Sequence, residues 1–527
     1  MNILSNVVLF KCIIEYCKSD RDKLSLLYLD HSTYSFRNKI RFNEFPMKYF
    51  QLKYNQTRLK PNIPTNYKTI RLLTIDQLTL YRTMRKWITS QTLVIAIPSM
   101  ISHNLRNERI QKFKISSYVK KLVLGHGAHR FLEFDGVIPD TVEKINCKFT
   151  DPPKEYWLPK KLKSLKFTVS SREWNPNILY LNLQKELPSS LIELKCNIGE
   201  TSLLMRYFPQ QCNITRLTID RLNQPLLPGL LPSSIEYLSF DQVDTVFTIG
   251  SFPDRMKVLV MGTNYNHPID PGTFPDTLRI LYLPIKFNHI LEPGSLPNGL
   301  KKLYIGDKYK VELQLDVIPK SLEKLVLGDG YRHELKVGVL SEGLKSLQMY
   351  NKDVILNIGS IPKSVESLRS YYISPIYIPN VKIQKYIFSC IGPLKPLTLP
   401  HQLQKLKLSN SFNCVIGKGP IFPKSLTTLI FGINYDQPIR GSLPPTLTNL
   451  EFGYKFNQFI YPNDIPLSVI SLTYGEYFNR PLNTDSIPPS VKYLHLKKKN
   501  PNYDPSLIPQ NVLHLQIADQ VIFNKLK

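Results

Sequence analysis

The chain has 527 residues, of which 42% are hydrophobic, so it can bury a core and is not disordered throughout. Its net charge is +27, and such a high positive charge can indicate a nucleic acid or a membrane surface as partner. Alanine, however, occurs only at Ala96, Ala128 and Ala518, while lysine, asparagine, isoleucine and tyrosine abound. Codon usage rich in A and T produces this bias whatever the function, so we attribute most of the charge to composition.

The sequence contains no sign of a membrane span or of a secretory leader. No apolar run approaches the roughly 20 residues that cross a bilayer. The stretch from Val7 to Ile14 is broken by Lys11 and lacks a basic leader and a small-residue cleavage site. The seven cysteines form no C-x-x-C pair, which argues against a disulfide scaffold. We therefore expect an intracellular protein, cytoplasmic or nuclear, without a membrane partner.

The first 42 residues predict a small helical domain. Val7, Phe10, Ile13 and Cys17 lie three or four positions apart, as on one face of a helix. A start that resembles a capping box at Ser19 begins a second short helix, and apolar residues between positions 34 and 40 indicate a third.

Three short helices ahead of a repeat array resemble an F-box. The core of the match is the run Cys12-Ile13-Ile14-Glu15-Tyr16-Cys17, followed by residues 20–29, with Leu4-Ser5 where that family has Leu-Pro. The resemblance implies a Skp-type adaptor and a cullin ubiquitin ligase as partners, contacted through the apolar residues Val8, Leu9, Ile13 and Leu24. A helical cap of the repeat array is the alternative interpretation.

Residues 43–115 predict an irregular N-terminal cap with the first coils. Pro64 begins one possible coil, whose apolar residues are Tyr67, Ile70 and Leu72. The period is lost between residues 73 and 115. A repeat array needs such a cap to cover its first open edge.

From residue 116 onward the prolines recur at a fixed spacing. The recurring position, which we call the proline slot, repeats every 22 residues on average, and Ser341 fills it once. A fixed period of this length is typical of a repeat architecture. The 18 slots are 139, 159, 188, 209, 232, 253, 275, 297, 319, 341, 362, 379, 400, 423, 444, 466, 488 and 509.

Each slot is followed by apolar residues three, six and eight positions later, as in Leu322, Leu325 and Leu327 after Pro319. A spacing of two between the last pair indicates one face of a short strand. Twenty-two residues leave little room for a helix on the return side. The sequence therefore predicts a β-rich solenoid over residues 116–527, with about 18 or more coils stacked along one long parallel sheet.

An aromatic residue stands ten residues before many slots, and asparagine often follows it. Tyr265, Phe287, Tyr309 and Tyr331 are each 22 residues apart, so stacking predicts a continuous aromatic spine in the core. The asparagine that follows the ring is expected to form a buried ladder bonded to turn amides.

The motif of a ring, asparagine, any residue, proline and an aliphatic residue resembles the FNIP repeat, a family known from amoebae and from giant viruses of amoebae. The clearest examples are Tyr265-Asn266-His267-Pro268-Ile269 and Phe478-Asn479-Arg480-Pro481-Leu482. The strand pattern also resembles leucine-rich repeats. Asn288, however, lies five positions after Leu283 and not three, so the turn must differ from the leucine-rich one.

No catalytic, cofactor or metal site is predicted. No Walker loop, G-x-G-x-x-G, H-E-x-x-H or G-x-S-x-G motif occurs in the sequence. Cys147 and Cys196 fill the third apolar strand position and are expected in the core. We therefore expect a non-enzymatic protein.

Strand side chains that point away from the core predict a target-binding patch on the concave sheet. Exposed apolar residues in adjacent coils favour binding of an unknown protein. Ordinary β-propensity is the alternative explanation of this pattern. The residues are Tyr237, Val258, Val260, Ile280, Tyr282, Lys302 and Tyr304.

The hypothesis is a substrate-recognition subunit of a Skp/cullin/F-box ubiquitin ligase. The alternatives are a protein-binding scaffold without ligase coupling and a basic nucleic acid-binding scaffold. Glu193, Glu323 and Glu366 among the lysines count against nucleic acid.

Overall fold

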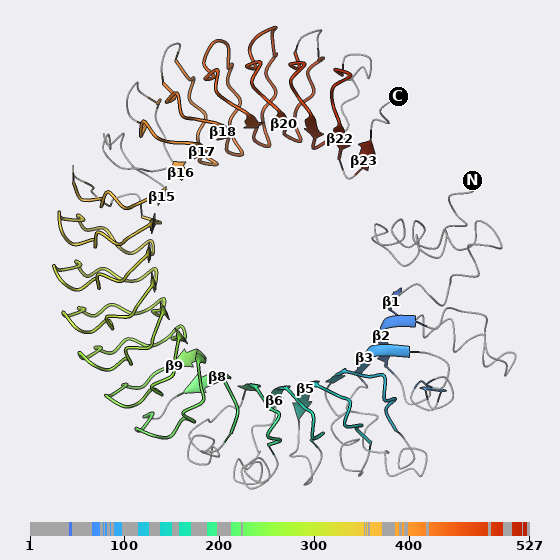
Figure 1. Ribbon diagram of the computed structural model, residues 1–527, viewed down its shortest axis with the longest axis vertical. Coiled ribbons are helices and arrows are strands. Elements are labelled where there is room, and N and C mark those ends of the chain that lie inside the picture. Colours follow the sequence, from blue (N-terminus) through green and yellow to red (C-terminus); the bar gives the residue numbers. More distant parts are fainter. Residues whose placement is uncertain are drawn as a thin grey trace, which may run out of the picture. The chain divides into compact units, whose positions relative to one another are not determined.

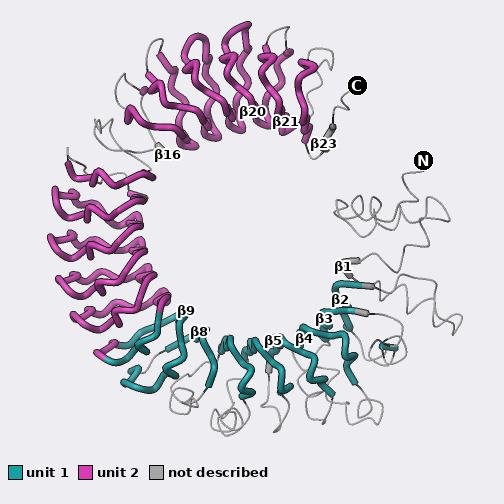
Figure 2. Tube along the Cα trace, in the orientation of Figure 1, with its two compact units in different colours: residues 1–245, 250–256 teal, residues 246–249, 257–527 magenta. Residues whose placement is uncertain are grey.

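The computed structural model shows a solenoid of short strands (Figure 1). It describes residues 42–44, 66–73, 89–96, 114–125, 137–149, 158–169, 187–197, 212–222, 225–351, 359–370, 385–388, 399–417, 421–482, 486–498, 508–518 and 520–523, with a few single residues between these ranges. The predicted helical domain, with Val8, Leu9, Ile13 and Leu24, lies outside the described residues. The chain divides into two compact units, one of residues 1–245 with 250–256 and one of residues 246–249 with 257–527 (Figure 2).

In unit 1 each strand pairs in parallel with the next one along the chain. The strands are β1 (Phe42–Glu44), β2 (Asn66–Leu72), β3 (Thr89–Ile95), β4 (Lys121–Leu124), β5 (Lys144–Phe149), β6 (Ser164–Val169), β7 (Glu193–Asn197), β8 (Arg216–Leu222) and β9 (Tyr237–Val243).

In unit 2 the strands from β10 to β22 also pair in parallel, each with the next. The strands are β10 (Val258–Val260), β11 (Ile280–Tyr282), β12 (Lys302–Ile305), β13 (Lys324–Leu327), β14 (Ser346–Met349), β15 (Ser367–Ser370), β16 (Lys385–Phe388), β17 (Lys405–Leu408), β18 (Thr428–Ile430), β19 (Asn449–Glu451), β20 (Ser471–Tyr474), β21 (Tyr493–Leu496), β22 (His514–Ile517) and β23 (Gln520–Phe523).

The proline slot sets the geometry of each coil. The N–H three residues after the slot donates to the slot carbonyl, as from Leu322 to Pro319 over 3.0 Å, and this turn leads into the strand. The fixed φ of proline suits such a turn. Three residues before the slot the backbone has positive φ, at Gly294 (φ 89) and Gly338 (φ 87) for example, and Asp316 takes the same position with φ 62. A strand follows every one of the 18 slots, so the sequence located these strands correctly.

The apolar triplets form the core, as predicted. Leu322, Leu325 and Leu327 have no exposed surface. Equivalent residues of adjacent coils are paired across the sheet, since Leu303 pairs with Leu325 and Ile305 pairs with Leu327. Each coil therefore buries its leucines against equivalent residues of its neighbours, which is how a solenoid builds a core from units that have none alone.

The predicted aromatic spine is present and buried. Phe287 stacks between Tyr265 and Tyr309 with ring centroids 6.4 and 5.8 Å away, and Tyr309 stacks on Tyr331 at 6.4 Å. A second spine runs through Phe412, Tyr435, Phe456 and Phe478. Offset ring contacts at these distances add stabilisation of about 0.5–1.5 kcal/mol per pair beyond the area buried.

The asparagine ladder bonds as predicted but lies at the surface. Oδ1 of Asn266 accepts the N–H of Asn288 at 2.9 Å, and Oδ1 of Asn288 accepts the N–H of Lys310 at 2.7 Å. Both asparagines are exposed, so the expectation of a buried ladder is wrong. The amides that need a partner lie on the outer turn, and a side chain that reaches them there stays in contact with solvent.

Three details differ from the sequence prediction. Although a strand follows each slot, only about 15 turns of the solenoid are shown, fewer than the 18 or more expected, and several return segments fall outside the described residues. β3 continues the parallel sheet between residues 73 and 115, where no coil was located. At the other end β23 pairs antiparallel with β22, which the sequence analysis missed. The described residues contain almost no helix.

Candidate functional site

Strand alternation brings most of the predicted target-binding residues together in unit 2. β10, β11 and β12 lie in register. The residue between the two exposed positions of each strand points into the core, and these residues are Leu259, Leu281 and Leu303. The residues at the first position of each strand form one exposed column across the sheet, and the residues at the third position form a second column. Six of the seven predicted residues lie on these columns: Val258, Val260, Ile280, Tyr282, Lys302 and Tyr304.

Two tyrosines form the centre of this surface. The rings of Tyr282 and Tyr304 stack across adjacent strands with centroids 4.1 Å apart and planes within 10°. Nζ of Lys324 lies 5.0 Å from the centre of the Tyr304 ring, an arrangement typical of a cation–π contact. Both rings remain partly exposed. We call Val258, Val260, Ile280, Tyr282 and Tyr304 the apolar patch.

The charges around Tyr304 change its ionisation. Partial burial alone would raise the pKa of this phenol, but hydrogen bonds with Lys324 and Tyr282 and the charges of Lys324 and Lys302 bring the pKa below its ordinary value. A tyrosine in this setting is a better hydrogen-bond donor than a free phenol. Lys324 follows Lys302 in the same column.

The remaining predicted residue, Tyr237, belongs to unit 1. The guanidinium of Arg216, on the neighbouring strand β8, lies 4.1 Å from the centre of its ring. Ser239 in unit 1 and Val326 in unit 2 occupy the third strand position, but both are buried, with 7% and 8% of their surface accessible. These two positions therefore contribute little to any contact surface.

Over a long stretch of unit 2, all charged residues on the exposed columns of the described strands are basic. In the strands that the structure describes from β10 to β18, neither column contains an aspartate or a glutamate. The first acidic residue on the columns is Glu451 in β19, whose Oε1 is 2.9 Å from Nζ of Lys497. The basic residues with described side chains on these strands are Lys302, Lys324, Arg369, Lys405 and Lys407.

The acidic residues that the sequence analysis placed among the lysines lie elsewhere in unit 2. Glu323 precedes β13, at the strand start, and its carboxylate lies 3.1 Å from Nζ of Lys301 and 3.6 Å from Nζ of Lys345. Glu366 holds the equivalent position before β15. Of the three acids only Glu193, in unit 1, is a strand residue. On the described strands from β10 to β18 of unit 2, acidic residues therefore do not mix with the lysines of the exposed columns, contrary to the expectation from the sequence.

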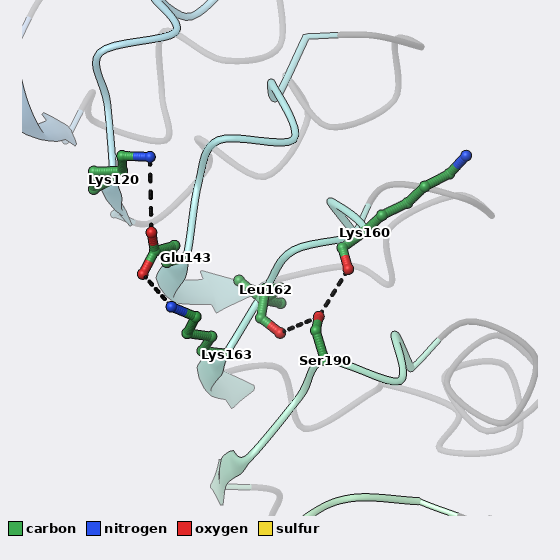
Figure 3. Close-up of polar contacts among 6 residues, drawn as sticks. All are labelled: Lys120, Glu143, Lys160, Leu162, Lys163 and Ser190. Atoms are coloured by element: carbon green, nitrogen blue, oxygen red, sulfur yellow. Dashed lines mark hydrogen bonds and ion pairs between the residues drawn. The ribbon is translucent and has the colours of Figure 1, made fainter.

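A similar ladder of ion pairs marks the strand starts of unit 1 (Figure 3). Glu143 lies between Lys120 at 3.7 Å and Lys163 at 2.9 Å, and these lysines lower the pKa of its carboxyl, mainly through the hydrogen bond from Lys163. Next to it, the hydroxyl of Ser190 donates to the carbonyl oxygens of Lys160 and Leu162, both at 2.7 Å. The ion pairs are exposed, so each contributes little to stability.

The described residues offer no second site of recognisable chemistry. Among them, no group of three or more histidine, cysteine or acidic side chains could hold a metal ion. Cys147 and Cys196 lie in the core as predicted, and burial raises the pKa of both thiols, which makes them poor nucleophiles. No helix among the described residues is long and apolar enough to cross a membrane.

Six segments of the chain match a known repeat. The model of the FNIP Repeat matches six segments, at residues 208–242, 246–285, 287–330, 331–369, 416–455 and 456–499. The chain contains FNIP repeats. This confirms the FNIP part of the sequence prediction for these segments.

One solved structure supports the fold class. The crystal structure of CroV588, described as a novel circular LRR protein, is similar over 84% of this chain and 74% of that chain, with a TM-score of 0.59 and 22% identity. YopM from Yersinia enterocolitica WA-314 aligns over 87% of this chain and 84% of its own, with a TM-score of 0.36 and 16% identity. No curated protein matches the chain in sequence. The FNIP repeats thus build a solenoid that resembles leucine-rich repeat proteins.

Proposed function

We infer that this protein is a non-enzymatic scaffold that binds a target protein on the exposed sheet face of unit 2. The observation that carries the proposal is the apolar patch, in which two stacked tyrosines and three aliphatic residues remain accessible on consecutive strands. Tyrosine is enriched at the centres of protein interfaces because it offers a large apolar surface with one polar end.

The rigidity of the sheet supports the same conclusion. The leucines beneath the patch are fully buried, so the exposed side chains stand on strands fixed from below. A preformed surface loses little conformational entropy when a partner binds. A cytoplasmic or nuclear setting goes with this proposal, since the free cysteines suit a reducing compartment.

A display library of random peptides, panned against the full chain, tests the proposal. Peptides that bind the functional surface should lose binding to the double variant Ile280→Thr and Tyr282→Thr, which keeps β-propensity but removes the apolar surface. The matched control is Ile290→Thr with Leu315→Thr, since both residues are exposed, at 53% and 57%, and lie outside the strands. Peptides that bind all three proteins equally would contradict a role for the patch.

Coupling to a ubiquitin ligase is the second candidate function. It rests on the F-box-like run at residues 12–29 alone. The test is to express the chain with a Skp-type adaptor, with and without residues 1–42. Recovery of the adaptor with the full chain only would support ligase coupling. Equal recovery, or no adaptor with either chain, would leave a scaffold without ligase coupling.

A further inference from the structure

We propose that the target segment bound on the sheet face of unit 2 is acidic, with apolar side chains next to its carboxylates. This inference rests on the proposed scaffold function and adds the chemistry of the partner. Its basis is the charge of the two exposed columns, which hold basic residues and no acidic ones from β10 to β18 in the described strands.

Among the described residues, no acidic side chain forms an ion pair with the lysines beside the apolar patch. Lys302 and Lys324 occupy adjacent positions of one column, and neither has an acidic partner among the described residues. Glu323, which precedes Lys324 in the chain, is shared by Lys301 and Lys345. An incoming carboxylate would therefore meet two ammonium groups that are not paired with a carboxylate of the described residues.

The apolar and basic parts of the surface lie side by side in a fixed order. Ile280 pairs with Lys302, and Lys302 pairs with Lys324, so the apolar strands β10 and β11 lead directly to the basic positions of β12 and β13. Neighbouring strands are about 4.8 Å apart. A matching partner has its carboxylates within about 5–10 Å of its apolar side chains, which an amphipathic acidic segment provides.

The geometry favours such a protein segment over single-stranded nucleic acid. Nucleobases bind basic surfaces by stacking on free aromatic faces. Tyr304 has Tyr282 against one face and the ammonium of Lys324 over its ring, and Tyr282 uses one face for Tyr304. On its other side Tyr282 pairs with Val260 of β10, so the patch combines aliphatic side chains with rings that already stack on each other, which suits leucine-like side chains better than bases.

Fluorescence anisotropy with the full chain tests the inference through four labelled probes. Three are peptides of about 16 residues: one alternates leucine and glutamate, one has glutamine for each glutamate, and one has serine for each leucine. The fourth is a thymidine oligonucleotide of the same length. The leucine–glutamate peptide should bind most tightly, and the double variant Lys302→Glu with Lys324→Glu should weaken its binding by about 10-fold or more.

The matched control is Lys286→Glu with Lys320→Glu, which changes the net charge equally at two exposed lysines outside the strands. It should weaken binding by less than about 2-fold. Equal weakening by both double variants, or tighter binding of the oligonucleotide, would overturn the inference. If the glutamine peptide binds as tightly as the glutamate peptide and still depends on Tyr282, the acidic partner is refuted while the scaffold function stands. If no peptide depends on Tyr282, the scaffold function fails as well.

Discussion

The hydroxyl of Ser321 donates a hydrogen bond to the carbonyl oxygen of Leu300, 2.7 Å away and one coil earlier. The same bond recurs at 2.6–2.9 Å after seven other slots that have serine or threonine two residues later. Each of these bonds satisfies the carbonyl of a buried aliphatic residue and joins consecutive coils. The equivalent pairs are Ser190 with Leu162, Ser234 with Ile214, Ser364 with Leu344, Ser425 with Leu403, Thr446 with Leu426, Ser468 with Leu447 and Ser490 with Val469.

Removing this hydroxyl should weaken the stack. We expect Ser321→Ala to lower the free energy of unfolding by about 1 kcal/mol, because the Leu300 carbonyl loses its donor in a partly buried site. Ser321→Thr should retain most of the stability, since Thr446 makes the same bond over 2.9 Å. Urea denaturation followed by circular dichroism measures both. Identical midpoints for wild type and Ser321→Ala would contradict the assigned bond.

Two tyrosines of the aromatic spine should respond oppositely to loss of the hydroxyl. The hydroxyl of Tyr309 is buried and finds no hydrogen-bond partner among the described residues, whereas that of Tyr265 donates to the Pro268 carbonyl at 3.1 Å. We expect Tyr309→Phe to raise the free energy of unfolding by up to about 1 kcal/mol and Tyr265→Phe to lower it by a similar amount. Thermal denaturation of the two variants compares them directly, and a loss of stability in Tyr309→Phe would show that its hydroxyl is satisfied.

The spine should also make the protein sensitive to alkali. Burial raises the pKa of Tyr265 and of Tyr331 to about 12, above the ordinary value of about 10 that applies once the chain unfolds. The unfolded state therefore binds fewer protons than the folded state between these values, and stability falls as pH rises from about 10 to 12. Urea midpoints across this range should drop less steeply in Tyr265→Phe combined with Tyr331→Phe. An unchanged slope would exclude these two phenols as the cause.

The positive φ three residues before the slot predicts a ranking of substitutions. At Gly294 (φ 89), alanine should cost about 1–2 kcal/mol of unfolding free energy, because a Cβ is disfavoured in the left-handed region. Asparagine should cost less, since Asn463 occupies the equivalent position with φ 68. Crowding does not explain the cost, because an added Cβ would meet only Pro271 at 3.4 Å. Equal stabilities of Gly294→Ala and Gly294→Asn would contradict this reasoning.

Much of the fold follows from the sequence because one residue type marks each turn. Proline fixes φ at the slot, and the leucine positions that follow are decided by strand alternation. β3 escaped notice because Trp87 stands six residues before Leu93, where other coils have proline. The antiparallel β23 follows a turn at Ala518, with φ 51, which no composition signal marks.

The candidate site could be predicted only in outline. Alternation placed Ile280, Tyr282 and Tyr304 on one face, and the register confirms that they adjoin. The contact of Lys324 with Tyr304 depends on side-chain orientation, which spacing does not determine. Glu323 stands one residue before Lys324, which lies on the exposed column. Because of this difference of one position, the column is basic and does not mix acidic with basic residues.

The bond from Ser321 to Leu300 has a consequence for how such a gene can change in length. Deleting residues 298–319 in one piece would leave Pro297 followed directly by Lys320 and would bring Ser321 over Leu278, whose carbonyl holds the same place one coil earlier. Ser321 would thus find an equivalent acceptor. Loss or duplication of a whole coil is therefore far easier to tolerate than loss of a few residues, and lineages of such proteins should differ in steps of about 22 codons.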